Sequence, residues 1–534
     1  MAARPTAVIR RGAARPLLTM AKAGLADRSK RWLYLVHRWI GIVTCLLFLI
    51  WFLSGLVMIY VPFPHLSDQE RLSGLPRINW PQVRIGPAEA DLIASRSKPA
   101  ERLSLEMLST GPVWRITPAE GGQVVLSATS GVILTRFRAD AAAQTASAFG
   151  HARVEEVERL KRDQWTVAGS FNAHRPLYRV RLRGEGGRDL YVSSTTGAVM
   201  LDTNRIERFW NWLGSVPHWI YPTVLRQHQG AWRQVVLWVS GPCILAAVTG
   251  IWIGLLRARF GRRRFKGGRT TPYHGWMLWH HVAGLAGGLT LTLWIFSGWL
   301  SVDPGRLFAS PGLDPAAQTT YDGAQRLGHI DHAALATASG PGTKRVRLFW
   351  AASRPWLRVD RADASILLDA RTLRPATADR RAVIDAARQL VPTASVASVR
   401  LLTAPDFYWY DLSGMPQLPM LRIIFDDPAA SWVHIDPSSG TVEGAIDRRG
   451  RLYRWIFDLF HKWDFSLLVR NRPAWEAVLW ALSLLGIVTS ASGIWIAWKR
   501  LRRSTGSRKG QRDQPNGRYV ALQSENKRRG QRDK

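Results

Sequence analysis

The chain of 534 residues contains only two cysteines, Cys45 and Cys243. Two cysteines cannot build a disulfide framework, a cysteine-rich zinc site or the C-x-x-C-H motif that attaches haem covalently. The sequence also lacks a P-loop and a G-x-G-x-x-G segment after a predicted strand, so we expect no nucleotide-binding site. Acidic residues are few, 39 against 73 basic ones, which gives a formal net charge of +34. Hydrophobic residues are plentiful at 46%, and the 26 tryptophans exclude a wholly disordered chain.

Four windows without charged residues are each long enough to cross a bilayer as a helix, which takes roughly 20 residues. They are residues 39–61, 235–256, 282–302 and 477–498. The first window follows a basic stretch, as the apolar part of a secretory signal does, but it is long and no small-x-small cleavage site follows it. We therefore expect a multi-pass membrane protein whose first span is a retained anchor.

The basic residues cluster beside the predicted spans. Residues 1–38 hold nine Lys or Arg and one acid, residues 257–269 hold seven and none, and residues 499–534 hold thirteen and three. These short segments carry about three quarters of the net charge, and such segments stay cytoplasmic. We expect both termini in the cytoplasm and the two long connections on the opposite face. The basic residues then serve topology and contacts with anionic lipids, so we expect no nucleic-acid partner.

Rare residue types recur along the chain at a single offset of 243 residues. The matched pairs include His37 with His280, Gly41 with Gly284, Ser54 with Ser297, Gly55 with Gly298, Pro176 with Pro419, His218 with His461, Gly250 with Gly493 and Trp252 with Trp495. The offset predicts a duplicated unit of span, outer domain and span. Two halves of the same topology are related by a pseudo-twofold axis along the membrane normal.

The expected fold is four transmembrane α-helices in two parallel, same-topology repeats, with two α+β domains outside the membrane. Segments such as YRVRL and LRIIF are typical of strands, and aromatic residues at helical spacing favour interfacial helices before the second and fourth spans. The expected segments are a basic cytoplasmic tail (1–31), spans at 32–61, 232–256, 276–302 and 474–498, outer domains at 62–204 and 303–447, interfacial segments at 205–231 and 448–473, a basic cytoplasmic loop (257–275) and a basic, disordered cytoplasmic tail (499–534).

Four histidines form two matched pairs, and histidine at a membrane span indicates function by default. His37 and His280 open outward-going spans near their cytoplasmic ends, whereas His218 and His461 precede the returning spans on the outer side. The repeat axis brings each histidine opposite its counterpart. Zinc usually takes three or four protein ligands, but haem iron needs only axial groups, for which histidine is the usual donor. Two b-type haems held by these pairs would make a path for electrons across the membrane.

The same residues also have a simpler interpretation. An interfacial histidine can serve as an anchor, and small residues in spans often serve helix packing. On the haem hypothesis, four glycines leave room for a flat macrocycle: Gly41, Gly284, Gly287 and Gly288. His281, next to His280, is a substitute ligand and His228 a weaker one. On the outer domains, the candidates for substrate contact are His174, His434, Tyr408 and Trp409.

Several segments resemble the PepSY-associated transmembrane family of bacterial inner-membrane proteins, over roughly Arg31 to Arg500. They are HRWIGIVTCLLFLIWFLSGLV, DLYVSSTTGAV, WRQVVLWVSGPCILAAVTGIWIGLLR and the pair DFYWYDLSGMPQLPMLRIIFDD and WVHIDPSSGTV. Members are associated with iron uptake, and characterised ones are di-haem reductases that release iron from ferric siderophores in the periplasm. The resemblance implies PepSY-type outer domains and axial-ligand roles for His37, His280, His218 and His461.

The chain departs from this family in two places. His434 stands where the family more often has Tyr, and the first half has Ser193-Ser194 in place of the Asp-Pro of the second half. The leading hypothesis is an inner-membrane di-haem protein that reduces a ferric siderophore or another ferric chelate, with a quinol or a cytoplasmic reductase as electron donor. A non-enzymatic PepSY sensor or protease regulator, and a small-solute or iron permease component, are alternatives that need no paired histidines.

Overall fold

The computed structural model describes residues 17–512, apart from 96–97, 120 and 413–414. Residues 1–16 of the expected first tail and 513–534 of the expected last tail lie outside the described residues. Tertiary contacts divide the chain into two compact units. We call Met1–Leu53, Trp238–Phe296 and Trp480–Lys534 the helix unit, and Ser54–Leu237 and Ser297–Leu479 the sheet unit.

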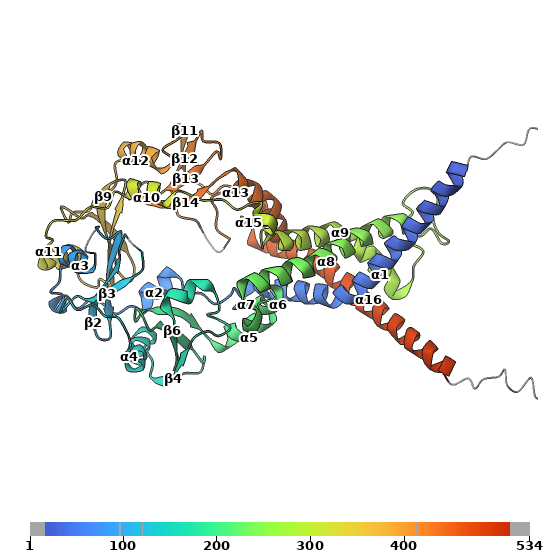
Figure 1. Cartoon of the computed structure of the whole chain (residues 1–534), viewed down its shortest axis with the longest axis horizontal. Coiled ribbons are helices and arrows are strands. Elements are labelled where there is room, and N and C mark those ends of the chain that lie inside the picture. The colour runs from blue at the N-terminus through green and yellow to red at the C-terminus, as the bar shows by residue number, and fades with distance from the viewer. Residues whose placement is uncertain (1–16, 96–97, 120, 413–414, 513–534) are drawn as a thin grey trace, which may run out of the picture. The chain divides into compact units, whose positions relative to one another are not determined.

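Four long helices correspond to the four expected spans, and each is long and apolar enough to cross a membrane. They are α1 (Leu17–Tyr60), α8 (Gln229–Arg257), α9 (Gly275–Leu300) and α16 (Arg472–Arg512), and Figure 1 shows them running side by side. Helix α16 continues beyond residue 498, where we expected the span to end. Within the helix unit, Phe48 and Phe52 of α1 pack with Cys243 and Ala246 of α8 and Ile295 of α9. Large apolar side chains such as Trp238 remain exposed, which suits helices surrounded by lipid.

The sheet unit contains one six-stranded antiparallel sheet to which both halves of the chain contribute. Its order is β10-β9-β8-β1-β2-β3. The strands are β1 (Arg102–Leu108), β2 (Gly111–Thr117), β3 (Val124–Ser127), β8 (Arg345–Ala351), β9 (Arg354–Asp360) and β10 (Ser365–Asp369). The central pair, β1 and β8, joins residues that the sequence assigns to two separate outer domains, 62–204 and 303–447.

Two four-stranded antiparallel sheets complete the sheet unit, one from each half. The first consists of β4 (Val154–Leu160), β5 (Leu177–Leu182), β6 (Asp189–Ser193) and β7 (Val199–Thr203), and the second of β11 (Val396–Leu402), β12 (Met420–Phe425), β13 (Trp432–Ile435) and β14 (Val442–Ile446). One helix covers each sheet through small and apolar residues: α4 (Ala139–Gly150) on the first and α12 (Arg380–Ala387) on the second.

The offset of 243 residues recurs in these elements. Strands β1 and β8, β2 and β9, β5 and β12, and β7 and β14 begin and end 243 residues apart. In the β1–β8 pair, Ser104 lies opposite Arg347, which is its own counterpart at that offset. An antiparallel pair in which a residue meets its own counterpart has a local twofold axis between the two strands. The two halves of the sheet unit are therefore joined about such an axis.

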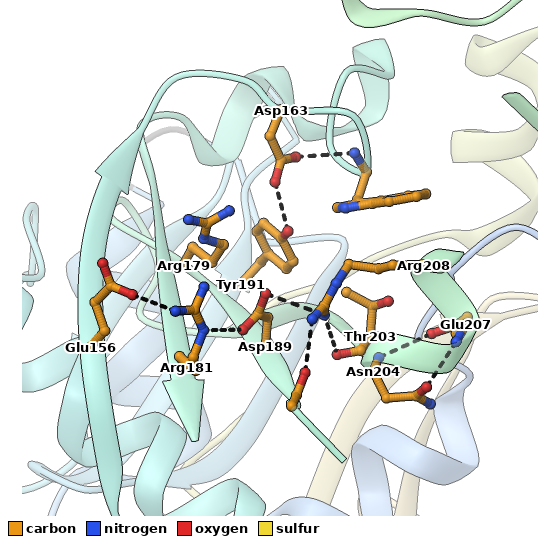
Figure 2. A network of polar contacts seen from close by, with 12 residues as sticks. Glu156, Asp163, Arg179, Arg181, Asp189, Tyr191, Thr203, Asn204, Glu207 and Arg208 are labelled. Atoms are coloured by element: carbon orange, nitrogen blue, oxygen red, sulfur yellow. Dashed lines mark hydrogen bonds and ion pairs between the residues drawn. The ribbon is translucent and has the colours of Figure 1, made fainter. Parts of the chain in front are cut away.

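Short helices connect each four-stranded sheet to the following long helix. They are α5 (Arg205–Leu213), α6 (Ser215–His218) and α7 (Thr223–Arg226) in the first half, and α13 (Arg448–Tyr453), the π-helix η5 (Arg454–Asp458), α14 (Leu459–Lys462) and α15 (Ser466–Val469) in the second. Helix α5 begins with a capping box between Asn204 and Glu207. Asp189 of β6 accepts from Arg181 and pairs with Arg208, which ties the sheet to α5 (Figure 2).

The remaining short elements lie between the long helices and the strands. They are α2 (Asp68–Gly74), η1 (Trp80–Gln82), α3 (Pro87–Ala94), η2 (Gly169–His174), η3 (Pro304–Arg306), α10 (Pro315–Asp322), α11 (His332–Ser339) and η4 (Arg388–Leu390).

Candidate functional site

The helix unit brings His37 of α1 against His280 of α9. Their ring centroids lie 6.3 Å apart, with an angle of 45° between the ring planes. Nδ1 of His37 lies 3.0 Å from the carbonyl oxygen of Ala246 on α8, and Nδ1 of His280 lies 2.9 Å from that of Thr489 on α16. A carbonyl only accepts, so each Nδ1 carries the proton and each Nε2 has a lone pair. Each of these two imidazoles could therefore bind a metal through Nε2.

The sheet unit brings His218 of α6 against His461 of α14 in a similar way. Their ring centroids lie 6.2 Å apart, with 71° between the ring planes. Nδ1 of His218 lies 3.1 Å from the hydroxyl of Ser54, and Nδ1 of His461 lies 3.0 Å from that of Ser297. Both serines are buried. In all four histidines, therefore, the same ring nitrogen is held by a neighbouring long helix.

A glycine lies beside each of the four imidazole rings. A methyl carbon at Gly250 would be 2.8 Å from Cε1 of His37, and one at Gly493 would be 3.4 Å from Cε1 of His280. The corresponding distances are 3.3 Å from Gly55 to His218 and 3.7 Å from Gly298 to His461. Gly250 and Gly493 each stand one helical turn after the carbonyl that holds the ring, so the missing side chain opens the approach to that carbonyl.

Two of the four glycines that the sequence suggested as lining a macrocycle pack closely against side chains of other long helices. A side chain at Gly287 would meet Leu485 at 2.9 Å, and one at Gly288 would meet Ile251 at 2.8 Å. These two glycines allow close helix packing. Gly284 faces Thr489, whereas a methyl group at Gly41 would meet nothing within 4 Å.

In the second half, one aromatic ring contacts His461 and a polar network fixes the chain just beyond it. The ring of Phe457 stacks on His461 at 5.3 Å, and position 214, its counterpart in the first half, is glycine. Three residues after His461, the buried Asp464 accepts from the hydroxyl of Tyr410 at 2.6 Å and lies 2.9 Å from Nη1 of Arg454. Burial and the Asp464 carboxylate raise the pKa of Tyr410. This network fixes the chain that follows α14.

The two weaker ligand candidates lie apart from the histidine pairs. His281 is buried, its Nε2 is 2.9 Å from the carbonyl of Gly254, and its ring contacts Tyr273. It therefore faces α8, and His280 is the residue that meets His37. His228 lies directly before α8, and its backbone bonds to Leu225 and Trp232. Among the described contacts, His228 joins neither pair.

The four candidates for substrate contact are not gathered around one site. Nδ1 of His174 lies 3.2 Å from the hydroxyl of Ser193, and burial, together with nearby arginines, lowers the pKa of His174. His434 is buried in the other half, where it accepts from Arg422 at 2.8 Å and stacks on Trp409 at 4.7 Å.

Burial and the charge of Arg422 lower the pKa of His434 to about 4, so the ring is neutral at pH 7. The hydroxyl of Tyr408 accepts from the indole of Trp455. Of these three residues His434 is buried, whereas Tyr408 and Trp409 are half-buried.

The described residues contain no group of three or more His, Cys, Asp or Glu that could hold a metal ion alone. A site built on either histidine pair therefore needs a metal that brings most of its own ligands. The sequence reasoning named the four histidines but missed Ser54, Ser297, Gly250 and Gly493 as their neighbours. The signal was present, because all four recur at the offset of 243 residues.

A family model described as the PepSY-associated TM region matches residues 34–372, which is more than half of the chain. The matched range includes most of α1, all of α8 and α9, and three of the four paired histidines, His37, His218 and His280. The comparison with curated proteins found no match.

Proposed function

The chain belongs to the PepSY-associated transmembrane family, and on that premise we propose that it is a di-haem membrane protein that reduces ferric siderophores for iron uptake. The observation that carries the proposal is the twice-repeated pair of facing imidazoles, each held through Nδ1. One haem belongs between His37 and His280, and the other between His218 and His461.

The spacing of the rings supports ligation of one iron by each pair. A metal–imidazole bond is about 2.0 Å long and the ring nitrogen lies about 1.1 Å from the ring centre, so two imidazoles on opposite sides of one metal have centroids about 6.2 Å apart. The two measured separations are 6.3 Å and 6.2 Å. Two axial nitrogens complete the coordination of a haem iron but not of a structural zinc.

The residues of the chain do the positioning. The Ala246 and Thr489 carbonyls hold Nδ1 of His37 and His280 and fix the tautomer of these two rings. The Ser54 and Ser297 hydroxyls hold Nδ1 of His218 and His461. Glycines beside the rings leave space next to each imidazole. The bound haems would supply one-electron redox chemistry at both histidine pairs.

Basic residues support a bacterial inner-membrane location with both termini in the cytoplasm. Those beside the long helices cluster before residue 39, between 257 and 269, and after 498. In this topology both halves cross outward, fold outside and return. His37 and His280 then serve the cytoplasmic side, and His218 and His461 the periplasmic side, where a ferric chelate would be reduced. The donor is a quinol or a separate reductase, since the sequence has no nucleotide-binding motif.

Reduction weakens the hold of a siderophore on iron. Hydroxamate and catecholate oxygens are hard donors that favour Fe(III), so Fe(II) is released more easily.

The test is a visible spectrum of the protein purified in detergent after haem-replete expression. Soret and α bands that sharpen with dithionite, and two haems per chain, are expected; the absence of both bands would refute the proposal. His37→Ala and His461→Ala should each remove about one haem, and His281→Ala should remove none. Retention of both haems in the first two variants would refute the assignment of the pairs. A ferric siderophore with an Fe(II)-capturing dye then tests turnover.

A further inference from the structure

A cavity of about 450 Å³ lies in the first half of the sheet unit, between the end of β4 and the segment before β5. Its lining consists of Arg159, Leu160, Lys161, Arg162, Arg175 and Pro176. Four of these described residues are cationic and none is acidic. The volume is in the range of small-molecule sites, which runs from roughly 300 to 1,000 Å³.

Asp163, the acid that follows Arg162, offsets part of the positive charge of this cavity and is itself engaged within its own loop. Asp163 accepts from the hydroxyl of Tyr191 at 2.6 Å and from two backbone N–H groups of the same loop (Figure 2). Arg175 donates to the carbonyls of Thr166 and Ala168, which fixes the wall of the cavity. Burial and the positive charge of Arg162 lower the pKa of Arg175, as expected where cations crowd together.

The second half of the chain provides an internal comparison. Strands β5 and β12 and the prolines before them, Pro176 and Pro419, correspond at the offset of 243 residues. The four cations, however, correspond to Leu402, Ala404, Pro405 and Leu418. The same strands form in the second half without any of these charges, so the strands do not require them, although Arg175 also fixes the cavity wall. Four cations around one cavity therefore favour an anionic ligand.

The cavity is linked to the segment that follows His218. Gln164, two residues after Arg162, donates to the carbonyl of Tyr221 at 2.7 Å and accepts from the backbone N–H of Thr223 at 3.0 Å. Tyr221 is three residues beyond His218. A ligand in the cavity would thus be held by a loop that is bonded directly to the segment carrying one of the two outer histidines.

We propose that this cavity binds the ferric substrate as a polyanion, an iron chelate whose catecholate or carboxylate oxygens leave it with a net negative charge. The inference rests on the proposed function and narrows its substrate class. Neutral and cationic chelates gain nothing from four positive charges. A trianionic chelate gains from each of them, and the attraction falls as salt screens it.

Binding of a redox-inert probe tests the inference on the full-length protein in detergent. The probe is the trianionic gallium(III) complex of a tris-catecholate, and its affinity is measured by titration calorimetry against the neutral gallium tris-hydroxamate. The double variant Arg159→Gln/Arg162→Gln should bind the trianion roughly tenfold or more weakly at low ionic strength, with a smaller loss at high salt. Both side chains are exposed, so folding is expected to be intact. The matched control is Arg153→Gln, exposed just before β4 and outside the cavity lining, which should bind as the wild type does.

Equal affinity of the double variant and the wild type for the trianion would overturn the inference. So would displacement of the trianion by an equal concentration of inorganic phosphate, which would assign the cavity to phosphate groups such as those of lipids. Gallium is not reduced, so this result is independent of the haems. A protein without haem bands that still binds the trianion in a charge-dependent way would refute the redox proposal and support the anion site.

Discussion

The Gly250→Ala substitution would place a methyl group against the ring of His37. The new carbon would lie 2.8 Å from Cε1 of that ring, well inside the ordinary contact distance of about 3.5–4.0 Å. The ring cannot turn away without losing its 3.0 Å contact with the carbonyl of Ala246. A metal–ligand distance tolerates a deviation of only about 0.2 Å. Overpacking of this kind costs about 1–3 kcal/mol, which would weaken haem binding roughly 5- to 150-fold at the inner pair.

Alanine substitutions at the other three glycines form a series in which the distance from the added methyl carbon to the histidine ring increases. A methyl group would lie 3.3 Å from the ring of His218 at Gly55, 3.4 Å from that of His280 at Gly493 and 3.7 Å from that of His461 at Gly298. Contacts beyond 3.4 Å are ordinary, so Gly298→Ala should retain both haems. Gly55→Ala and Gly493→Ala should lose part of the outer and the inner haem, respectively, and less than Gly250→Ala loses.

The assay is the haem content per chain by pyridine haemochrome, combined with haem titration into protein produced without haem. Gly241→Ala is the matched control, because it also lies in α8 and a methyl group there meets nothing within 4 Å. Equal haem binding by the Gly250→Ala and Gly241→Ala variants would refute the assignment of His37, packed against Gly250, as a haem ligand.

Three further predictions address the supports of the site and the sheet unit. Ser54→Ala and Ser297→Ala each remove the partner of an outer Nδ1, at a net cost of about 0.5–1.5 kcal/mol, and should weaken retention of the outer haem alone by roughly 2- to 13-fold; equal loss from both haems would contradict this. Asp464→Ala leaves the buried Arg454 and the half-buried Tyr410 without their partner. It should cost about 3–5 kcal/mol of stability, seen as a lower thermal midpoint, whereas Asp385→Ala in an exposed ion pair should change the midpoint little. The pKa of His434 is about 4 in the folded protein, against an ordinary value of 6.5. Between these two pH values the unfolded state binds more protons than the folded state. The folded protein should therefore lose roughly 3 kcal/mol of stability as the pH falls from 6.5 to 4. His434→Gln should flatten the pH dependence of the thermal midpoint in that window, and an unchanged dependence would contradict the assignment.

The spans could be predicted from the sequence because their signal is local. A run of roughly 20 residues without charge has to be a helix inside a bilayer, where every backbone group needs an internal partner. The pairing of the four histidines also follows from the sequence, since rare residues recur at one offset. Both predictions can be made without knowing which side chains contact one another in the folded protein.

The neighbours of the histidines could not be predicted from the sequence alone. Every residue has a carbonyl, so nothing in the chain marks those of Ala246 and Thr489 as the ones that hold Nδ1. His280 and His281 are adjacent and chemically identical, and only the packing of α9 decides that His280 faces His37 while His281 faces Gly254.

The sequence by itself determined the four membrane-spanning segments, the excess of basic residues beside them and the offset that relates the two halves. The tertiary structure decided which strands and side chains of the two halves contact one another. Strands β1 and β8 pair although more than two hundred residues separate them in the sequence. The register that sets Ser104 opposite Arg347 depends on the packing of both halves. Likewise, a glycine's role depends on its neighbour: Gly250 makes room for a histidine ring, whereas Gly288, on the next helix, makes room for Ile251.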